Sequence, residues 1–149
     1  MTNAKFLPLA LLYVDGGRQV DGITRLQKLV FLAQQEKLDE YENGYDFAPY
    51  KYGPYSEELT HALEIFEDRG YINKNVETTR NGNEKYTYSL TDEGRKIVKK
   101  GLLGGGGNKR LFEAAEEVKD AHNREPIERV LRYVYNKYPS FAEQSELDI

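Results

Sequence analysis

Apolar residues recur at helical spacing between about residues 22 and 37. This apolar face consists of Ile23, Leu26, Leu29, Val30, Phe31, Leu32 and Ala33. A face this broad predicts a central helix that packs against neighbours on more than one side. Lys28 is the polar residue of this helix whose pKa merits a check, although a lysine that snorkels to solvent is the ordinary explanation.

Two further helices are predicted on either side of the central one. Residues 5–14 form a short apolar run with Pro8 in the first turn, where proline is tolerated. Another helix is predicted from Ser56 to Arg69, where Ser56 is a preferred N-cap and Gly70 supplies the left-handed residue that commonly ends a helix. The apolar stripe of this third helix is Leu59, Ala62, Leu63 and Phe66.

The chain then has the pattern of a β-hairpin. Residues 71–76 and 85–90 flank a polar loop that contains Asn81-Gly82, which is a strong hairpin signal. In the second segment apolar and polar residues alternate, so one face is expected to be buried. The residues of that face are Tyr86, Tyr88 and Leu90. Thr91 then caps a further helix with an acidic first turn and a basic end.

Glycine fills positions 104–107, and a flexible linker is the expected structure there. A phosphate-binding loop is disfavoured, because no Gly-Lys-Ser or Gly-Lys-Thr follows and no predicted strand precedes the glycines. The predicted organisation is therefore a first domain at residues 1–103, a linker at 104–109 and a helical extension at 110–149.

Two amphipathic helices are predicted in the extension, and the second is opened by Pro126 and ended by Pro139. The apolar stripe of this second helix consists of Ile127, Val130, Leu131 and Val134. It would either meet a symmetry mate in a homodimer or fold back on the first domain, and the sequence leaves both alternatives open. A homodimer is the expected oligomer, and the acidic tail from residue 140 is expected to be frayed.

Five of the twelve tyrosines fall between residues 41 and 55, in an aromatic segment between the second and third predicted helices. Pro49 and Pro54 push the residues before them away from helical geometry, so the segment is expected to be extended. Most of its rings are expected to pack on the core, with an exposed minority left to bind a partner. The rings expected to be buried are Phe47 and Tyr52, and those expected to be exposed are Tyr50 and Tyr55.

The composition disfavours catalysis and metal binding. The chain has no cysteine and only two histidines, His61 and His122, which lie far apart in the sequence. Without a cluster of histidines or spaced carboxylates we expect no enzyme activity, no metal and no cofactor. The apolar run from residue 7 to 14 is too short to span a bilayer, and no cleavage-site pattern follows it. A cytoplasmic protein without a membrane partner is expected.

Charge is sorted along the chain, although the net charge is only −4. Residues 56–70 carry five acidic residues and one basic residue, a net of −4, whereas residues 91–110 carry six basic and two acidic residues, a net of +4. Residues 111–149 carry nine acidic and five basic residues, again a net of −4. The overall charge argues against indiscriminate nucleic-acid binding, but its distribution matters more.

The order of elements predicts an α+β, mainly helical fold of the winged helix-turn-helix type, with C-terminal helices added. Three helices would form the core of a winged-helix domain at residues 1–103, and residues 71–90 would be the wing. The phrase Tyr88-Ser-Leu-Thr-Asp-Glu-Gly-Arg95 resembles the way in which many winged-helix regulators leave the wing. In those proteins a strand ends in Leu-Thr, and a helix opens with acidic residues and Gly-Arg.

A second resemblance covers about residues 23–66. Leu26-Gln-Lys-Leu-Val-Phe-Leu-Ala-Gln34, followed later by Tyr50-Lys-Tyr-Gly-Pro-Tyr-Ser56, resembles the Panacea (SocA-like antitoxin) family of small prokaryotic proteins. The matching positions are Lys28, Leu29, Phe31, Ala33, Gln34, Tyr52, Gly53 and Pro54. The resemblance implies a non-enzymatic protein that neutralises a toxin or presents a partner to a protease. The chain departs from the family in its long hairpin and its glycine-linked C-terminal helices, which suit a DNA-binding relative at least as well.

Two functions fit these patterns. By a narrow margin the sequence favours a DNA-binding transcriptional regulator, whose third helix enters the major groove and whose wing contacts the backbone or minor groove. The alternative is an antitoxin or adaptor that binds a partner protein through the same surface. The acidic third helix counts against DNA, because phosphate neutralisation supplies much of the affinity. The candidate contact residues are Tyr50, Lys51, Tyr55, Ser56, Thr60, His61, Lys74, Arg80, Asn81 and Lys85.

Overall fold

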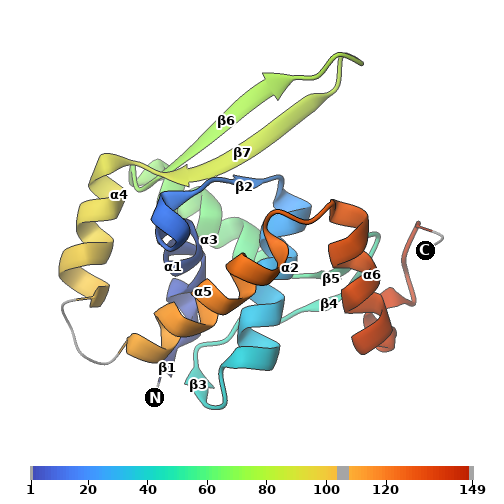
Figure 1. Cartoon of the computed structure of the whole chain (residues 1–149), viewed down its shortest axis with the longest axis horizontal. Coiled ribbons are helices and arrows are strands. Elements are labelled where there is room, and N and C mark those ends of the chain that lie inside the picture. Colours follow the sequence, from blue (N-terminus) through green and yellow to red (C-terminus); the bar gives the residue numbers. More distant parts are fainter. Residues whose placement is uncertain (1, 104–107, 148–149) are drawn as a thin grey trace.

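The computed structural model of the chain describes residues 2–103 and 108–147. It is an α+β structure built mainly of helices, and Figure 1 shows a long hairpin extending away from them. The helices are α1 (Leu7–Tyr13), α2 (Ile23–Leu32), α3 (Glu57–Asp68), α4 (Asp92–Ile97), α5 (Lys109–His122) and α6 (Ile127–Lys137). The strands are β1 (Thr2–Asn3), β2 (Val20–Asp21), β3 (Tyr41–Glu42), β4 (Ala48–Tyr50), β5 (Gly53–Tyr55), β6 (Ile72–Thr78) and β7 (Glu84–Leu90). None of the helices in these ranges has the length and apolar character that crossing a bilayer requires.

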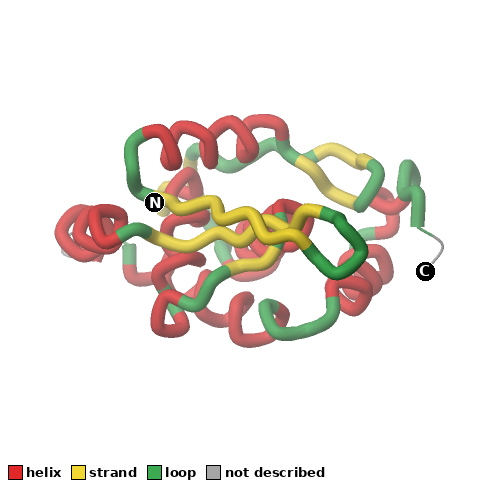
Figure 2. The backbone as a smooth tube through the Cα atoms, turned by 90° about the horizontal axis from the view of Figure 1, so that it is seen from above, coloured by secondary structure: helices red, strands yellow, loops and turns green. Residues whose placement is uncertain are grey.

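Three small sheets are present among the described residues, and the largest joins β2, β7 and β6 in that order. Pairing in the β6–β7 hairpin runs from Ile72 with Leu90 to Thr78 with Glu84, and Figure 2 shows the hairpin running across the helices. The predicted hairpin is thus confirmed, with a positive φ of 79° at Gly82 in its loop. The strand β2 was not predicted, because a two-residue pairing has no periodic signal in the sequence.

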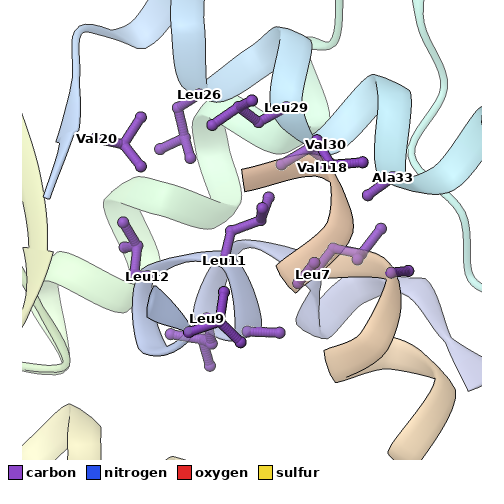
Figure 3. Packing of buried hydrophobic residues seen from close by; sticks show 14 of the residues in the cluster. Leu7, Leu9, Leu11, Leu12, Val20, Leu26, Leu29, Val30, Ala33 and Val118 are labelled. Carbon is purple, nitrogen blue, oxygen red and sulfur yellow. The ribbon is translucent and has the colours of Figure 1, made fainter. Parts of the chain in front are cut away.

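The broad apolar face of α2 is buried against several elements, as its pattern predicts. Seven consecutive residues, Leu26–Leu32, are buried, and α2 contacts α1, α5, α6 and β5. Figure 3 shows Leu11 of α1, Val30 of α2 and Val118 of α5 within one cluster of apolar side chains. One π-helical turn extends α2 to Lys37, so the observed helix ends where the sequence pattern predicts.

The C-terminal helices fold back on the rest of the chain and share its core. The face of α5 toward α1 and α2 is fully buried, and it consists of Leu111, Ala114, Ala115 and Val118. In α6, Val130, Leu131 and Val134 are buried within the same chain, and Ile127 is half-buried. Of the two alternatives left open by the sequence, the structure shows this stripe packed within the chain, where α5 and α6 contact α2. The predicted linker glycines at 104–107 lie outside the described residues.

The tail after α6 is docked rather than frayed as far as Leu147. Pro139–Ala142 forms a 3-10 turn that places the Phe141 ring 4.9 Å from the Phe31 ring, edge to face. The Tyr135 hydroxyl donates to Ser145 Oγ at 2.8 Å, and the Glu146 amide donates to the Lys51 carbonyl at 2.9 Å. These contacts correct the expectation of a frayed tail, which was based on its acidic composition alone.

The junction between the hairpin and α4 explains the Leu-Thr-Asp-Glu-Gly-Arg phrase. The Thr91 hydroxyl donates to the Gly70 carbonyl at 2.5 Å and accepts from the Gly94 amide at 2.9 Å, so it caps α4 and ties it to the end of α3. The Thr91 amide donates to the Tyr71 carbonyl at 3.0 Å. A Cβ atom at Gly94 would lie only 2.1 Å from the same carbonyl oxygen, so this position requires glycine.

Candidate functional site

Two glutamines of α2 hold the backbone of the aromatic segment. Gln27 Oε1 accepts from the Ser56 amide at 2.9 Å, and Gln27 Nε2 donates to the Ser56 carbonyl at 2.9 Å. Gln34 makes the same pair of bonds with the amide and carbonyl of Tyr45, at 2.8 and 2.9 Å. Each side-chain amide thus pairs with one residue as a neighbouring strand would. Both glutamines are buried, so these bonds satisfy backbone groups that water does not reach.

Lys28 lies between the two glutamines and is also buried, with 2% of its surface exposed. Its Nζ donates to the Pro54 carbonyl at 3.0 Å. Burial lowers the pKa of the Lys28 amine to about 7, since desolvation disfavours the charged form. The ordinary explanation of a snorkelling lysine is therefore wrong for Lys28, because its head group points to a backbone carbonyl inside the protein.

The buried Lys28 predicts a pH dependence of stability. The folded-state pKa lies near 7 and the unfolded value near 10.5, so the unfolded chain binds an extra proton between these two pH values. The free energy of unfolding should therefore rise with pH from about 7 upward, by at most about 1.4 kcal/mol per unit. In Lys28→Met this pH-dependent contribution to the free energy of unfolding is absent. Urea unfolding from pH 6.5 to 9 measures both slopes, and equal slopes in the two proteins would contradict the assignment.

The Tyr-Gly-Pro turn joins β4 and β5 and closes over Lys28. Gly53 has a φ of 86°, and a Cβ atom there would lie 2.8 Å from Cε1 of Tyr135. Both features favour glycine at this position. Because Lys28 bonds to Pro54, the two motifs that resemble the Panacea family form one contact in the structure.

The aromatic segment is extended, as predicted, but the set of buried and exposed rings differs from the prediction. Tyr50 is exposed, as predicted, whereas Tyr52 is 42% exposed and its predicted burial is wrong. Phe47 is half-buried beside Phe31, with their ring centres 5.2 Å apart, and Tyr55 is half-buried rather than exposed. The buried tyrosine of this segment is Tyr45, whose hydroxyl donates to the Lys5 carbonyl at 2.8 Å.

A hollow of about 270 Å³ lies between α3 and the β6–β7 hairpin. Its apolar lining comes from α2, α3 and both hairpin strands, and consists of Ile23, Leu63, Ile72, Tyr86 and Tyr88, with Tyr55 beside them. Glu64 and Glu67 of α3 also line it, opposite Lys74 of β6. This surface therefore combines an apolar floor with an edge of two carboxylates and one lysine.

The three predicted contact residues on α3 do not form one exposed surface. Ser56 is buried and caps its own helix by accepting from the Leu59 amide at 3.1 Å. Thr60 accepts from Gln27 Nε2 at 3.0 Å and donates to the Tyr55 hydroxyl at 2.9 Å, so its polar group is used internally. His61 is exposed, and its neighbours on the solvent side of α3 are acidic. Those neighbours are Glu57, Glu58, Glu64, Glu67 and Asp68.

The predicted contacts on the hairpin and the turn are exposed but partly paired. Lys74 Nζ lies over the Tyr86 ring, 4.7 Å from its centre, and Lys85 Nζ lies 3.3 Å from an Asp21 carboxylate oxygen. Arg80 and Asn81 are exposed in the hairpin loop. On the β4–β5 turn, Lys51 is exposed and lies 4.0 Å from Glu146.

Sequence reasoning missed the apolar floor of the hollow. The alternation in β7 indicates a buried face, but it does not say that this face meets the N-terminal turn of α2 at Ile23. The charge pattern of the sequence indicates part of this surface, because Glu64 and Glu67 belong to the acidic cluster at residues 56–70. The hollow could therefore have been placed near the third helix, but its depth and lining depend on packing.

Comparison with known proteins finds a similar protein, but the name of that protein gives no activity. No family model matches the chain. The chain is similar to a Bacillus subtilis (strain 168) protein named "Uncharacterized protein YwgA", with 37% identity over 86 residues. The match covers 58% of this chain and 49% of the relative, so the matched region spans about half of the relative's length. The relative's name states no activity, and function is therefore inferred from the chain's own residues.

Proposed function

We propose that the protein is a non-enzymatic binding module that holds a partner protein in the hollow between α3 and the hairpin, in the role of an antitoxin or adaptor. The observation that carries this proposal is the apolar floor at Ile23, Leu63 and Tyr88 beside the acidic residues Glu64 and Glu67. A partner segment with an apolar anchor and flanking lysines or arginines matches both parts of this surface.

The order of elements supports a winged-helix form of the fold. Three helices precede the β6–β7 hairpin, and the short strand β2, between α1 and α2, pairs with β7 to complete a three-stranded sheet. In such a fold the third helix and the wing are the parts that meet a ligand. Here these are α3 and the hairpin, and the hollow lies between them.

The charge on α3 favours a basic protein over DNA. The solvent side of this helix carries five carboxylates and no lysine, with Arg69 at its C-cap. A helix that enters the major groove approaches phosphates on both sides, and protein–DNA affinity depends on cations that neutralise them. The same carboxylates attract a basic protein surface and exclude acidic competitors.

Co-expression with the product of the neighbouring reading frame tests this proposal. We expect the two proteins to co-purify, and a toxic neighbour to lose its toxicity. The double charge reversal Glu64→Lys with Glu67→Lys should weaken partner capture about tenfold or more, because two favourable charges become repulsive. Both substituted residues are exposed, so stability should change little.

The matched control is Glu116→Lys with Glu143→Lys, which changes the net charge equally at exposed residues that do not line the hollow. The control pair should retain the partner. Equal loss of capture in both pairs, or full capture by the Glu64/Glu67 pair, would contradict the assigned surface.

DNA binding is the second candidate, and exposed basic residues favour it. Arg95, Lys96, Lys99 and Lys100 are exposed on α4 and the turn after it, and Arg80 is exposed in the hairpin loop. A gel-shift titration with the DNA upstream of the gene, at several salt concentrations, separates the two functions. We expect no specific shift; sub-micromolar specific binding that weakens as salt increases would favour the regulator.

A further inference from the structure

A second cavity lies between the start of α2 and the β4–β5 turn, next to the hollow proposed for the partner protein, with which it shares Ile23 and Tyr55. Its volume is about 200 Å³. The lining residues are Ile23, Thr24, Gln27, Lys28, Tyr50, Tyr52 and Tyr55. Three tyrosines of the turn thus face one side of α2, and a buried lysine lies among them. The cavity is smaller than the pockets of about 300 Å³ or more that drug-sized ligands occupy, so its ligand would be small.

Lys28 lacks a counter-charge within the part of the chain that the structure describes. An ammonium group has three N–H donors, and one of them reaches the Pro54 carbonyl. The described residues place no carboxylate within 4.0 Å of Lys28 Nζ and no second acceptor in hydrogen-bonding geometry. Buried charges are usually paired, whereas the remaining donors of Lys28 have no acceptor among the described residues.

The other buried lysine, Lys119, has two internal acceptors where Lys28 has one. Its Nζ donates to the carbonyls of Val14 and Arg18, at 2.9 and 2.6 Å, and the charge of Asp15 acts on it favourably. Lys119 therefore fixes the loop after α1 and lines neither of the two cavities described above. Lys28 differs in both respects, since it has a single acceptor and borders a cavity.

The cavity adjoins a wider hollow of about 590 Å³, with which it shares Ile23, Thr24 and Tyr52. The apolar residues of α6 and the tail that line this hollow are Ile127, Leu131 and Leu147. Arg25 also lines it, and its buried Nε has no hydrogen-bond partner among the described residues. An apolar ligand body could therefore continue past Tyr52, where the charged lining comprises the cations Arg25 and Lys85 and the carboxylates Asp21, Glu84 and Glu128.

We propose that this cavity binds small apolar carboxylates, with the carboxylate on Lys28 Nζ and the apolar body among Tyr50, Tyr52 and Tyr55. The carboxylate supplies the acceptor and the negative charge that Lys28 lacks. The tyrosine rings supply apolar contact area for the body of the ligand. This proposal is separate from that of the partner protein, because Lys28, Tyr50 and Tyr52 do not line the hollow beside α3.

The test uses 3-phenylpropionate as the probe and its neutral amide, 3-phenylpropionamide, as the matched ligand. Amide signals of the full-length ¹⁵N-labelled chain are followed by NMR as each compound is added at pH 6. We expect saturable shifts at Ile23, Thr24 and Tyr52 with the carboxylate, and at least tenfold weaker binding of the amide. Equal affinity for both compounds would overturn the proposal, since an apolar cavity alone does not distinguish them.

The pH dependence of binding tests the role of Lys28 without a mutation. Among the described residues that line the cavity there is no carboxyl or imidazole group, so Lys28 is the group that changes charge between pH 6 and 8.5. With a pKa of about 7 for its amine, affinity for the carboxylate should fall at least tenfold over this range. An unchanged affinity would overturn the assignment of the carboxylate to Lys28.

Variants complete the test. Lys28→Met should lose binding of the carboxylate at least tenfold, whereas Lys119→Met, the other buried lysine, should retain it. If Lys28→Met does not fold, Tyr52→Ala serves in its place, because Tyr52 is 42% exposed and its loss should weaken binding about threefold or more without unfolding the chain. Unchanged binding in the folded Lys28→Met protein, or in Tyr52→Ala, would count against the site.

Discussion

Replacing Gly94 with alanine is expected to lower the free energy of unfolding by about 3 kcal/mol. The added Cβ atom would lie 2.1 Å from the carbonyl oxygen of Tyr71 and 2.9 Å from its carbonyl carbon. Both atoms belong to the backbone, so the new methyl group cannot be accommodated by a side-chain rotation. Either α4 or the start of the hairpin must move, which also strains the Thr91 bonds that join them.

The control for this substitution is Gly101→Ala in the turn after α4. A Cβ atom at Gly101 would have no neighbour within 4 Å, so alanine should be neutral or stabilise by up to about 1 kcal/mol through the unfolded chain. Urea unfolding followed by circular dichroism measures both variants. A destabilisation of Gly94→Ala no larger than that of Gly101→Ala would show that α4 is not held closely against Tyr71.

The second large effect is expected for Gln34→Leu, which should destabilise the fold by about 3 kcal/mol. Leucine has a similar volume but leaves the buried amide and carbonyl of Tyr45 without their partners, each at a cost of about 1–3 kcal/mol. Gln35→Leu is the matched control, because Gln35 is adjacent but exposed and its replacement should change stability by less than about 0.5 kcal/mol. Similar unfolding midpoints for the two variants would contradict the role of Gln34 as a backbone clamp.

The long elements of the fold were predictable because each has its own periodic signal. The central helix follows from the apolar face between Ile23 and Ala33, and the hairpin follows from Asn81-Gly82 between two alternating segments. The short strands β2, β4 and β5 have two or three residues each, which is too few for a period. Their pairing depends on where the neighbouring elements place them, and a single sequence does not contain that information.

The roles of individual polar residues were less predictable than the elements that carry them. Ser56 and Thr60 were candidates for contacts because the third helix was expected to enter the major groove of DNA, yet both are bonded internally. Tyr52 was expected to be buried, but on the β4–β5 turn its side chain is 42% exposed. Lys28 and Gln34 were visible as motif residues, but their acceptors, Pro54 and Tyr45, follow only from the three-dimensional arrangement.

The way in which α5 and α6 cover α2 has a consequence for synthesis of the chain. Bonds such as Lys119 to Val14 and Arg25 to Glu125 join residues about a hundred positions apart, and such contacts form late because long loops must close first. While a ribosome is still making residues 2–103, the broad apolar face of α2 has no C-terminal helices to cover it. The nascent chain therefore exposes an apolar surface until residues 108–147 emerge, and chaperones are expected to bind it during that interval.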